Sequence, residues 1–170
     1  MHKRLYILGS LFAISALICL STAFSNDKIL DVHYNQLTKD AQKQVDCLAQ
    51  NIYHEAGYES ETGKEAVAMV TLNRTQDPRF PKDICSVVQQ KVNSTCQFSW
   101  YCMSKTAISN MFVYNQARNI AVYVYANYEK MADVTEGALY YHADYVNPRW
   151  RLQQTTKIGR HIFYKEKDGS

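Results

Sequence analysis

The N-terminal leader sets the first limit on what this chain can fold into. The basic stretch "MHKR" is followed by 22 residues without a charged side chain, Leu5 to Asn26. This order is typical of a secretory signal. Small residues up to Ala23 predict cleavage after Ala23. The alternative is an uncleaved anchor, because a helix of this length, at about 1.5 Å per residue, can cross the roughly 30 Å core of a bilayer. We expect residues 1–26 to be a signal peptide or signal anchor. The rest of the chain is then periplasmic, secreted or held at the inner membrane by residues 5–26.

The remaining length and charge favour one domain that does not bind nucleic acid. Removing residues 1–23 from 170 leaves 147, enough for one hydrophobic core. The formal charge of +3 falls to +1 without Lys3 and Arg4, too little for a partner held by phosphate contacts. Thirteen tyrosines offer apolar faces with a hydroxyl, which suits a wet groove for a polar polymer such as a glycan. We expect a monomer that needs no cofactor and touches membrane only through its N-terminal segment.

Four cysteines lie outside the leader: Cys47, Cys85, Cys96 and Cys102. An even number in an exported domain predicts two disulfides, with three possible pairings. The short local loop favours Cys85–Cys96, which leaves Cys47–Cys102. Zinc ligation is disfavoured because the spacing contains no C-x-x-C.

Apolar spacing predicts helices in the first three quarters of the chain. After a tether at residues 27–37, the domain is expected to span residues 38–170. Helical periodicity covers 38–56, where Gly57 ends the helix. The capping box Thr62–Glu65 opens a second helix that runs to about Gln76. Further helices are expected at 84–90, capped by Asp83, and at 111–131, with a loop or extended segment at "NSTCQFSWYC" between them.

The C-terminal segment predicts strands. The stretches "ALYYHA", "LQQTTKI" and "RHIFYK" read as two or three short strands, with a turn at "DYVNPRW" and a hairpin at Gly159. Helices first and a small antiparallel sheet late indicate an α+β fold.

The segment His54-Glu55-Ala56-Gly57-Tyr58 raises the possibility of a zinc peptidase. That chemistry uses H-E-x-x-H, with two histidines one helical turn apart. Here Tyr58 occupies the second ligand position, Gly57 breaks the helix, and a third ligand would have to come from His142 or His161. We therefore expect no metal, and His54 is interpreted as a partner or groove-wall residue.

Glu55 is a candidate general acid. It follows Ile52 by three residues and Leu48 by seven, which places it near the buried stripe of its helix. Desolvation there should raise its pKa above about 4.3, and glycoside cleavage needs such an acid to protonate the leaving oxygen. Glu59, Glu61 and Glu65 cluster where the next helix starts, a position that favours negative charge for structural reasons.

Four stretches carry a family resemblance: "CLAQNIYHEAGYESETGKEAVAMVTLNRTQDPRFPKDICSVVQQ", "CQFSWYC", "ALYYHADYVNPRW" and "KIGRHIFY". Over residues 47–164 the chain resembles the SleB/CwlJ-type cell-wall hydrolases, which include the spore cortex-lytic enzymes. The resemblance implies a lysozyme-like, lytic-transglycosylase fold and cleavage of the β-1,4 bond between N-acetylmuramic acid and N-acetylglucosamine. It implies that Glu55 is the catalytic residue. It also implies a substrate groove lined by His54, Gln97, Phe98, Ser99, Trp100, Tyr140, Tyr141, His142 and His161.

The implied mechanism uses one carboxylate. Glu55 protonates the glycosidic oxygen, the C6 hydroxyl of the substrate attacks C1, and a 1,6-anhydro sugar forms. If Glu59 or Glu61 folds back as a second carboxylate, the product has a free reducing end instead. No separate peptidoglycan-binding repeat is evident, so vegetative wall turnover or phage lysis are alternatives to cortex lysis. Two other classes remain: a zinc-dependent wall amidase or peptidase, and a non-catalytic peptidoglycan-binding protein.

Overall fold

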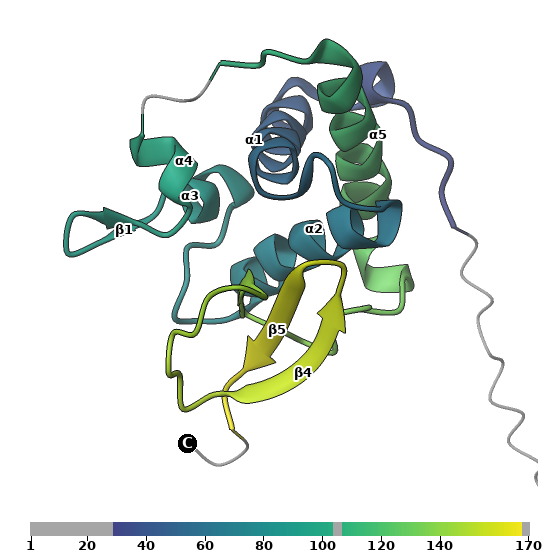
Figure 1. Ribbon diagram of the computed structural model, residues 1–170. Coiled ribbons are helices and arrows are strands. Elements are labelled where there is room, and N and C mark those ends of the chain that lie inside the picture. The colour runs from purple at the N-terminus through teal and green to yellow at the C-terminus, as the bar shows by residue number, and fades with distance from the viewer. Residues whose placement is uncertain (1–28, 104–106, 168–170) are drawn as a thin grey trace, which may run out of the picture.

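The computed structural model describes residues 29–103 and 107–167, and the predicted leader, residues 1–26, lies outside them. Helices come first and the main sheet last, so the predicted α+β fold is confirmed (Figure 1). The elements in chain order are η1 (Tyr34–Gln36), α1 (Lys39–Ala56), α2 (Glu61–Gln76), α3 (Ile84–Val88), β1 (Lys91–Val92), β2 (Thr95–Cys96), α4 (Ser99–Cys102), α5 (Met111–Asn127), η2 (Tyr128–Lys130), β3 (Tyr140–Ala143), β4 (Gln153–Ile158) and β5 (His161–Lys165).

Helix α1 runs where the apolar spacing predicts it. The Thr38 hydroxyl caps its N-terminus by accepting from the Ala41 N–H, and the apolar face from Val45 to Ala56 is buried in the main core. Gly57 follows the last turn. A Cβ at this position would approach the Tyr53 carbonyl oxygen to 2.5 Å and the Val113 side chain of α5 to 3.1 Å. The glycine therefore lets the end of α1 lie close to α5.

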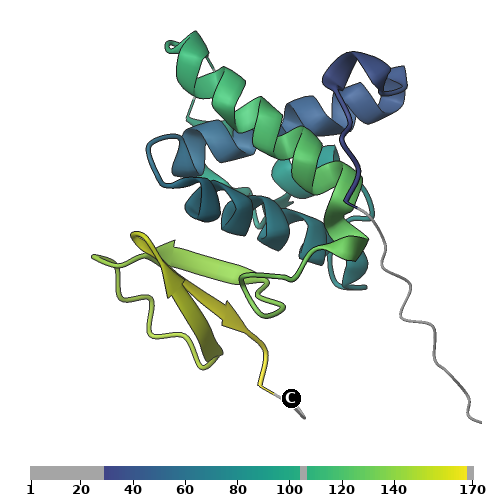
Figure 2. The same cartoon turned by 90° about the vertical axis from the view of Figure 1, so that its right-hand side faces the viewer.

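Helix α2 is the central element, because both of its faces are covered. Val67, Ala68 and Met69 join the core made with α1 and α5, whereas Ala66 and Val70 pack with Phe163 of the sheet. Figures 1 and 2 show β4 and β5 lying on the side of α2 opposite to α1 and α5. The predicted cap at Thr62 is wrong by two residues. Ser60 is the N-cap, and its hydroxyl accepts from the Gly63 N–H at 3.2 Å, so the first turn begins at Glu61.

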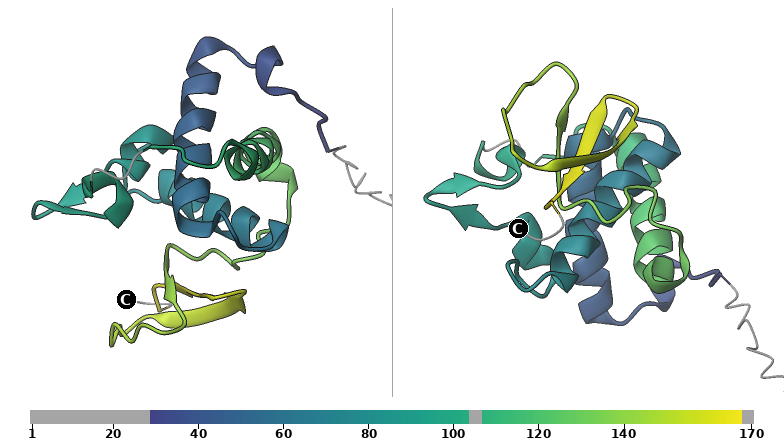
Figure 3. Two further views of the ribbon diagram at one scale, coloured as in Figure 1. Left: turned by 45° about the horizontal axis from the view of Figure 1, so that its top comes forward. Right: turned by 90° about the horizontal axis from the view of Figure 1, so that it is seen from below.

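The segment between α3 and α5 contains more structure than a loop. Asp83 caps α3 as expected, but a short antiparallel hairpin, β1–β2, and the one-turn helix α4 follow it. These elements project to one side of α1 (Figure 3). Burial alternates along them: Cys96, Phe98 and Trp100 point inward, and Gln97 and Ser99 are exposed.

The C-terminal sheet has the order β3-β5-β4, with both pairings antiparallel. The β4–β5 connection turns at Gly159, whose φ of +56° is the left-handed conformation that glycine adopts at least cost. Tyr141 pairs with Phe163, and His142 with Ile162. Because side chains alternate along a strand, Tyr141, Phe163 and His161 face the helices, whereas Tyr140, His142 and Tyr164 face away from them.

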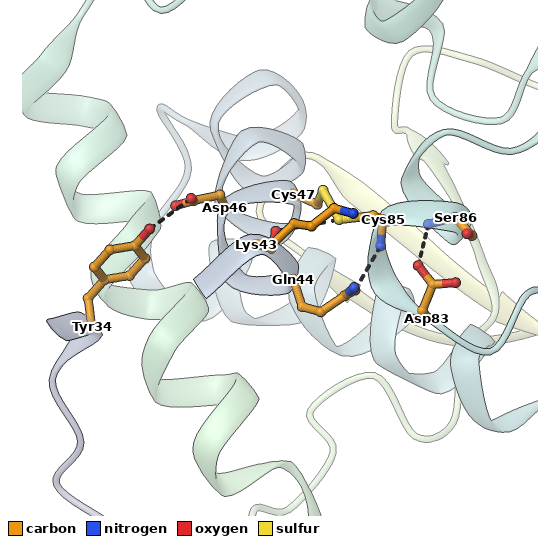
Figure 4. The surroundings of a disulfide bond; sticks show 8 residues. All are labelled: Tyr34, Lys43, Gln44, Asp46, Cys47, Asp83, Cys85 and Ser86. Carbon is orange, nitrogen blue, oxygen red and sulfur yellow. Dashed lines mark hydrogen bonds between the residues drawn. A yellow bond between two sulfur atoms is a disulfide. The ribbon is translucent and has the colours of Figure 1, made fainter. Parts of the chain in front are cut away.

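All four domain cysteines form disulfides, but the predicted pairing Cys85–Cys96 with Cys47–Cys102 is wrong. The bridges are Cys47–Cys85, with Cα atoms 5.2 Å apart, and Cys96–Cys102, with Cα atoms 5.9 Å apart. Cys85 packs against α1, where its N–H donates to the Gln44 side chain (Figure 4). The shortest loop lies instead in the 96–102 turn, which brings Cys102 back to Cys96. The local-loop argument therefore chose the wrong partner for Cys85, because Cys96 closes a shorter loop with Cys102.

Residues 29–37 of the expected tether pack on the helices. The Leu30 N–H donates to Asn127 Oδ1 at 2.6 Å, and the Leu30 carbonyl accepts from Asn127 Nδ2 at 3.0 Å. The Tyr34 hydroxyl donates to Asp46 at 2.8 Å (Figure 4). Within the described ranges, no helix has both the length and the apolar character needed to cross a bilayer.

Candidate active site

Glu55 lies in the last turn of α1, between two hollows of the surface. One is a cavity of about 310 Å³ lined by residues 53–59 and Ser109. The other, of about 140 Å³, is lined by Glu55, Arg74, Gln97, Phe98, Ser99 and Tyr141. Since Glu55 lines both, a chain-like ligand could extend past this residue on either side.

The surroundings of Glu55 favour its protonated form. Burial raises the pKa of Glu55 and is the largest influence on it. The hydrogen bond that the Tyr141 hydroxyl donates to Glu55 Oε2 at 3.2 Å lowers this pKa, as does the positive charge of Arg74. Desolvation exceeds both, so the group keeps its proton to a higher pH than an ordinary glutamate does.

Arg74 is a site residue that the sequence reasoning missed. It is 5% exposed, and its Nε donates to the Leu139 carbonyl at 2.8 Å. Its guanidinium lies over the rings of Phe80 and Phe98, each at 5.2 Å. The available signal was its spacing, four residues after Val70 and seven after Val67, which puts a cation on the buried face of α2.

The stretch 97–100 divides between cavity and core. Gln97 and Ser99 are exposed and line the smaller cavity, as expected for substrate-binding residues. Phe98 forms its floor and is 3% exposed. Trp100 is 6% exposed and donates from Nε1 to Asn51 at 3.1 Å. Its burial does not support the expected place of Trp100 in the wall of the substrate groove.

His54 precedes Glu55 in α1, whereas His161 lies behind Tyr141 and lines neither cavity. The His54 ring stacks on Trp100, with centroids 4.4 Å apart and planes 19° apart, and it lines the larger cavity. His161 is buried with its ring edge-to-face against Tyr141, centroids 5.1 Å apart. Burial lowers the pKa of His161, so the ring behind Tyr141 is neutral at neutral pH.

Tyr140 and His142 are on the opposite face of β3 from Tyr141. The Tyr140 hydroxyl donates to Glu166 at 2.9 Å, and the His142 ring stacks on Tyr164, centroids 5.2 Å apart. The structure therefore brings Tyr141 to Glu55 but not Tyr140 or His142, which the resemblance had grouped with it.

The other carboxylates near Glu55 are placed differently. Glu59 lines the larger cavity, but its carboxylate rests against the Gly159 turn, where a Cβ would collide with Glu59 Oε2. Glu61 is in the first turn of α2 and is exposed. Among the residues that the structure describes, no group of three or more His, Cys, Asp or Glu side chains is arranged to hold a metal ion.

The fold defines the class of the protein, because it is similar to the catalytic domains of SleB proteins. Two solved structures are similar. One is the catalytic domain of the germination-specific lytic transglycosylase SleB from Bacillus anthracis, with a TM-score of 0.57 and 27% identity, covering 73% of this chain and 95% of that one. The other is the catalytic domain of the Bacillus cereus SleB protein, with a TM-score of 0.55 and 26% identity, covering 73% and 91%. The expected lysozyme-like fold is thereby confirmed.

The sequence comparisons identify the family. A family model described as Cell Wall Hydrolase matches residues 58–164, and the chain belongs to this family. The matched range begins after Glu55. Relatives named spore cortex-lytic enzyme are 31% identical over 123 residues in Bacillus subtilis and 29% identical over 126 residues in Halalkalibacterium halodurans. The matches cover 68% and 70% of this chain, but only 35% and 34% of those proteins. This chain therefore spans about a third of the length of the curated relatives.

Proposed function

We propose that the domain is a lytic transglycosylase that cleaves the β-1,4 bond between N-acetylmuramic acid and N-acetylglucosamine in peptidoglycan, with Glu55 as general acid. The observation that carries this proposal is the half-buried Glu55 carboxyl at the junction of two cavities. Burial raises its pKa, as a proton donor near neutral pH requires. The likeness to the SleB catalytic domains supports the same chemistry.

The carboxyl group acts twice in the proposed reaction. The Glu55 proton passes to the glycosidic oxygen as the C1–O bond breaks and positive charge develops on the sugar ring. The resulting carboxylate accepts the proton of the C6 hydroxyl as that oxygen bonds to C1, so an anhydro sugar forms and Glu55 is protonated again. Tyr141 and Arg74 stabilise the carboxylate between the two steps. Because the Glu59 carboxylate rests against Gly159, a hydrolytic reaction through a second carboxylate is less well supported.

The test is Glu55→Gln assayed on purified sacculi, with mass spectrometry of the released fragments. The amide keeps the size of the side chain but cannot deliver a proton, so activity should fall by about 10² to 10⁴. The parent should release fragments with anhydro ends. Glu59→Gln is the matched control and should remain active. Near-normal cleavage by Glu55→Gln would contradict the proposal. Reducing ends among the fragments released by the parent would indicate hydrolysis. Release of free peptides that chelators prevent would indicate a zinc amidase or peptidase. Binding to sacculi without release of fragments would indicate a non-catalytic protein.

We also propose that the domain, residues 38–170, acts outside the cytoplasm as a monomer, with residues 1–26 as signal peptide or anchor. Two disulfides support an oxidising compartment. N-terminal sequencing of the cell fractions tests this proposal. Chain with Met1 intact in the cytoplasm would contradict it.

A further inference from the structure

Another cavity, separate from the two beside Glu55, lies on the face of the sheet that points away from the helices. Its volume is about 350 Å³, and it is lined by His142, Asp144, Val146, Asn147, Pro148, Arg149, Trp150, Ile162 and Tyr164. The walls come from β3, β5 and the loop between β3 and β4, which lies on the side of the sheet away from the helices (Figures 2 and 3). Pockets for small ligands start at about 300 Å³, so this cavity has room for one sugar unit.

Three aromatic rings form this cavity, and two of them are held rigidly. The Ala143 carbonyl can only accept, so His142 Nδ1, 2.9 Å away, carries the hydrogen. In the neutral ring Nε2 then accepts from the Tyr164 hydroxyl at 3.0 Å. The ring of Trp150 meets both edge-on, with centroids 5.4 Å from His142 and 5.6 Å from Tyr164. Rigid aromatic faces bind ligands at low cost in conformational entropy.

The loop between β3 and β4 keeps the Trp150 side chain partly exposed, and the backbone next to it is strained. Trp150 is 42% exposed, although tryptophan is usually well buried. Its neighbour Arg149 has a φ of +53°, a left-handed conformation that is strained for a residue with a side chain. Such strain is often associated with binding sites. Asn147 and Arg149 add hydrogen-bonding groups at the rim, while the Asp144 carboxylate is paired with Lys157 and Arg160.

The cavity is connected to the candidate active site through Tyr140. The Arg74 guanidinium, which lines the Glu55 cavity, lies 6.0 Å from the Tyr140 ring centroid. The other side of Tyr140 meets Trp150, with centroids 6.1 Å apart. Side-chain contacts thus run from Arg74 through Tyr140 to Trp150, which places the outer cavity near the edge of the sheet that borders the Glu55 cavity and within reach of a polymer bound there.

We infer that the cavity of His142, Trp150 and Tyr164 is a distal glycan site, which binds an N-acetyl sugar of the same strand that Glu55 cleaves. This inference rests on the proposed function. Sugar rings present apolar C–H faces to the aromatic rings and hydroxyl and amide groups to the rim. The site holds the strand in both ground and transition states, so it acts on substrate affinity and not on the chemical step.

The first experiment measures sedimentation of the purified full chain with sacculi, in the Glu55→Gln background so that the polymer stays intact. Trp150→Ala should weaken binding about two- to tenfold, the range for loss of one aromatic pairing. Tyr145→Ala is the matched control, because Tyr145 is exposed in the same loop but does not line the cavity. In the active chain, Trp150→Ala should raise KM on sacculi and leave kcat unchanged.

A second experiment reads the site without depending on cleavage or on folding of the alanine variant. The chain has two tryptophans, Trp100 in the core and Trp150 at the cavity. A soluble N-acetylglucosamine oligomer should change the tryptophan emission of the parent, and this change should disappear in Trp150→Phe.

Several outcomes would overturn the distal site. In the sedimentation experiment these are unchanged binding in Trp150→Ala and equal weakening of binding in Tyr145→Ala. In the emission experiment they are the absence of an oligomer-induced change in the parent and its persistence in Trp150→Phe. Loss of binding after the stem peptides are stripped from the sacculi would assign the cavity to peptide instead of glycan. Failure of the parent to cleave sacculi, with Trp150-dependent binding intact, would contradict the proposed function and leave the distal site standing.

Discussion

At Glu55 three influences on the pKa of one carboxyl group, burial and two neighbouring side chains, act in opposite directions. Burial favours the protonated acid, whereas the Tyr141 hydroxyl and the Arg74 guanidinium favour the carboxylate. A group that must first donate and then accept a proton benefits from such a balance. If burial acted alone, the deprotonated form of Glu55 would be unfavourable, and transfer of its proton to the substrate would be difficult. If Tyr141 and Arg74 prevailed, no proton would be available.

Tyr141→Phe should therefore move the pH profile in a defined direction. The hydrogen bond from Tyr141 lowers the pKa of Glu55, so its loss raises that pKa further. Because the general acid must be protonated, the alkaline limb of the kcat/KM profile should move to higher pH. The maximal rate should fall by about tenfold or less, as expected for one hydrogen bond. Rates on sacculi across a pH series provide the measurement.

Tyr128→Phe is the control for that experiment. The Tyr128 hydroxyl donates to Asn73 at 2.7 Å, so this variant also loses a hydrogen bond from a partly buried tyrosine, but it does so away from Glu55. Its pH profile should match that of the parent. An alkaline limb that stays in place or moves to lower pH in Tyr141→Phe would show that Tyr141 does not tune the acid.

Two independent signals in the sequence point to Glu55 as the candidate acid: its spacing from Leu48 and Ile52, and the family resemblance of the segment "IYHEA". Arg74 was missed because only apolar residues were counted as the buried face of α2. Trp100 was assigned to the groove because its motif matched, but the alternation along 96–100 turns its ring inward. Motif matching identifies a segment, whereas the direction of each side chain depends on local backbone structure that the segment alone did not predict.

Among the elements, the turn from β2 to α4 is the one whose geometry bears most directly on the site. It carries Gln97, Phe98 and Ser99, and the Cys96–Cys102 bridge closes it. The Cys47–Cys85 bridge instead joins α1 to α3, across a sequence separation of 38. None of the residues that line the Glu55 cavities belongs to α3. The two disulfides therefore have separable effects.

Replacing each pair by serines should separate stability from activity. Loss of Cys47–Cys85 should reduce the free energy of unfolding by about 4 kcal/mol, and loss of Cys96–Cys102 by about 2 kcal/mol, in the chain-entropy model. Activity at a temperature where both variants are folded should fall more in the Cys96/Cys102 variant, because the cavity wall becomes mobile. Denaturant unfolding and sacculus clearing measure the two effects. The opposite ranking in activity would show that the bridge does not hold the wall.

Most helices and strands could be predicted from the sequence, but the contacts between them could not. The helices around 39–56, 61–76 and 111–127 and the late strands arise from periodicity, caps and turn residues, all of which are local. The disulfide pairing depends on α3 packing beside α1, a contact between segments far apart in the chain. The β1–β2 hairpin has only two residues in each strand, too few for a periodic signal.

On the scale of the whole molecule, the segment before α1 is part of the packed structure. Residues 29–37 were expected to be a tether, yet Leu30 exchanges two hydrogen bonds with Asn127 at the end of α5. Asn127 is 1% exposed, and its amide nitrogen also donates to the Tyr123 carbonyl at 2.9 Å. If residues 29–37 were removed, the Asn127 side-chain oxygen would lose the hydrogen bond that the Leu30 N–H donates to it.

A chain that starts at Thr38 should therefore be less stable than one that starts at Ile29. An unpaired buried acceptor costs about 1 to 3 kcal/mol, and loss of the Tyr34 contact with Asp46 adds to this. Thermal unfolding of the two chains at the same pH measures the difference. Tyr34→Phe in the longer chain separates the contribution of the Tyr34 hydroxyl. Equal melting temperatures for the two lengths would show that the segment is only a tether after all.

The position of β5 in the sheet determines how late during synthesis the C-terminal sheet can form. This strand is the last described element in the chain, but it is the middle strand of the sheet, so β3 and β4 have no shared neighbour until it arrives. It also supplies Phe163, which covers the second face of α2. The central helix therefore stays half uncovered while the polypeptide is being made. The sheet and the core on this side of α2 can therefore form only after residue 165 has emerged from the ribosome.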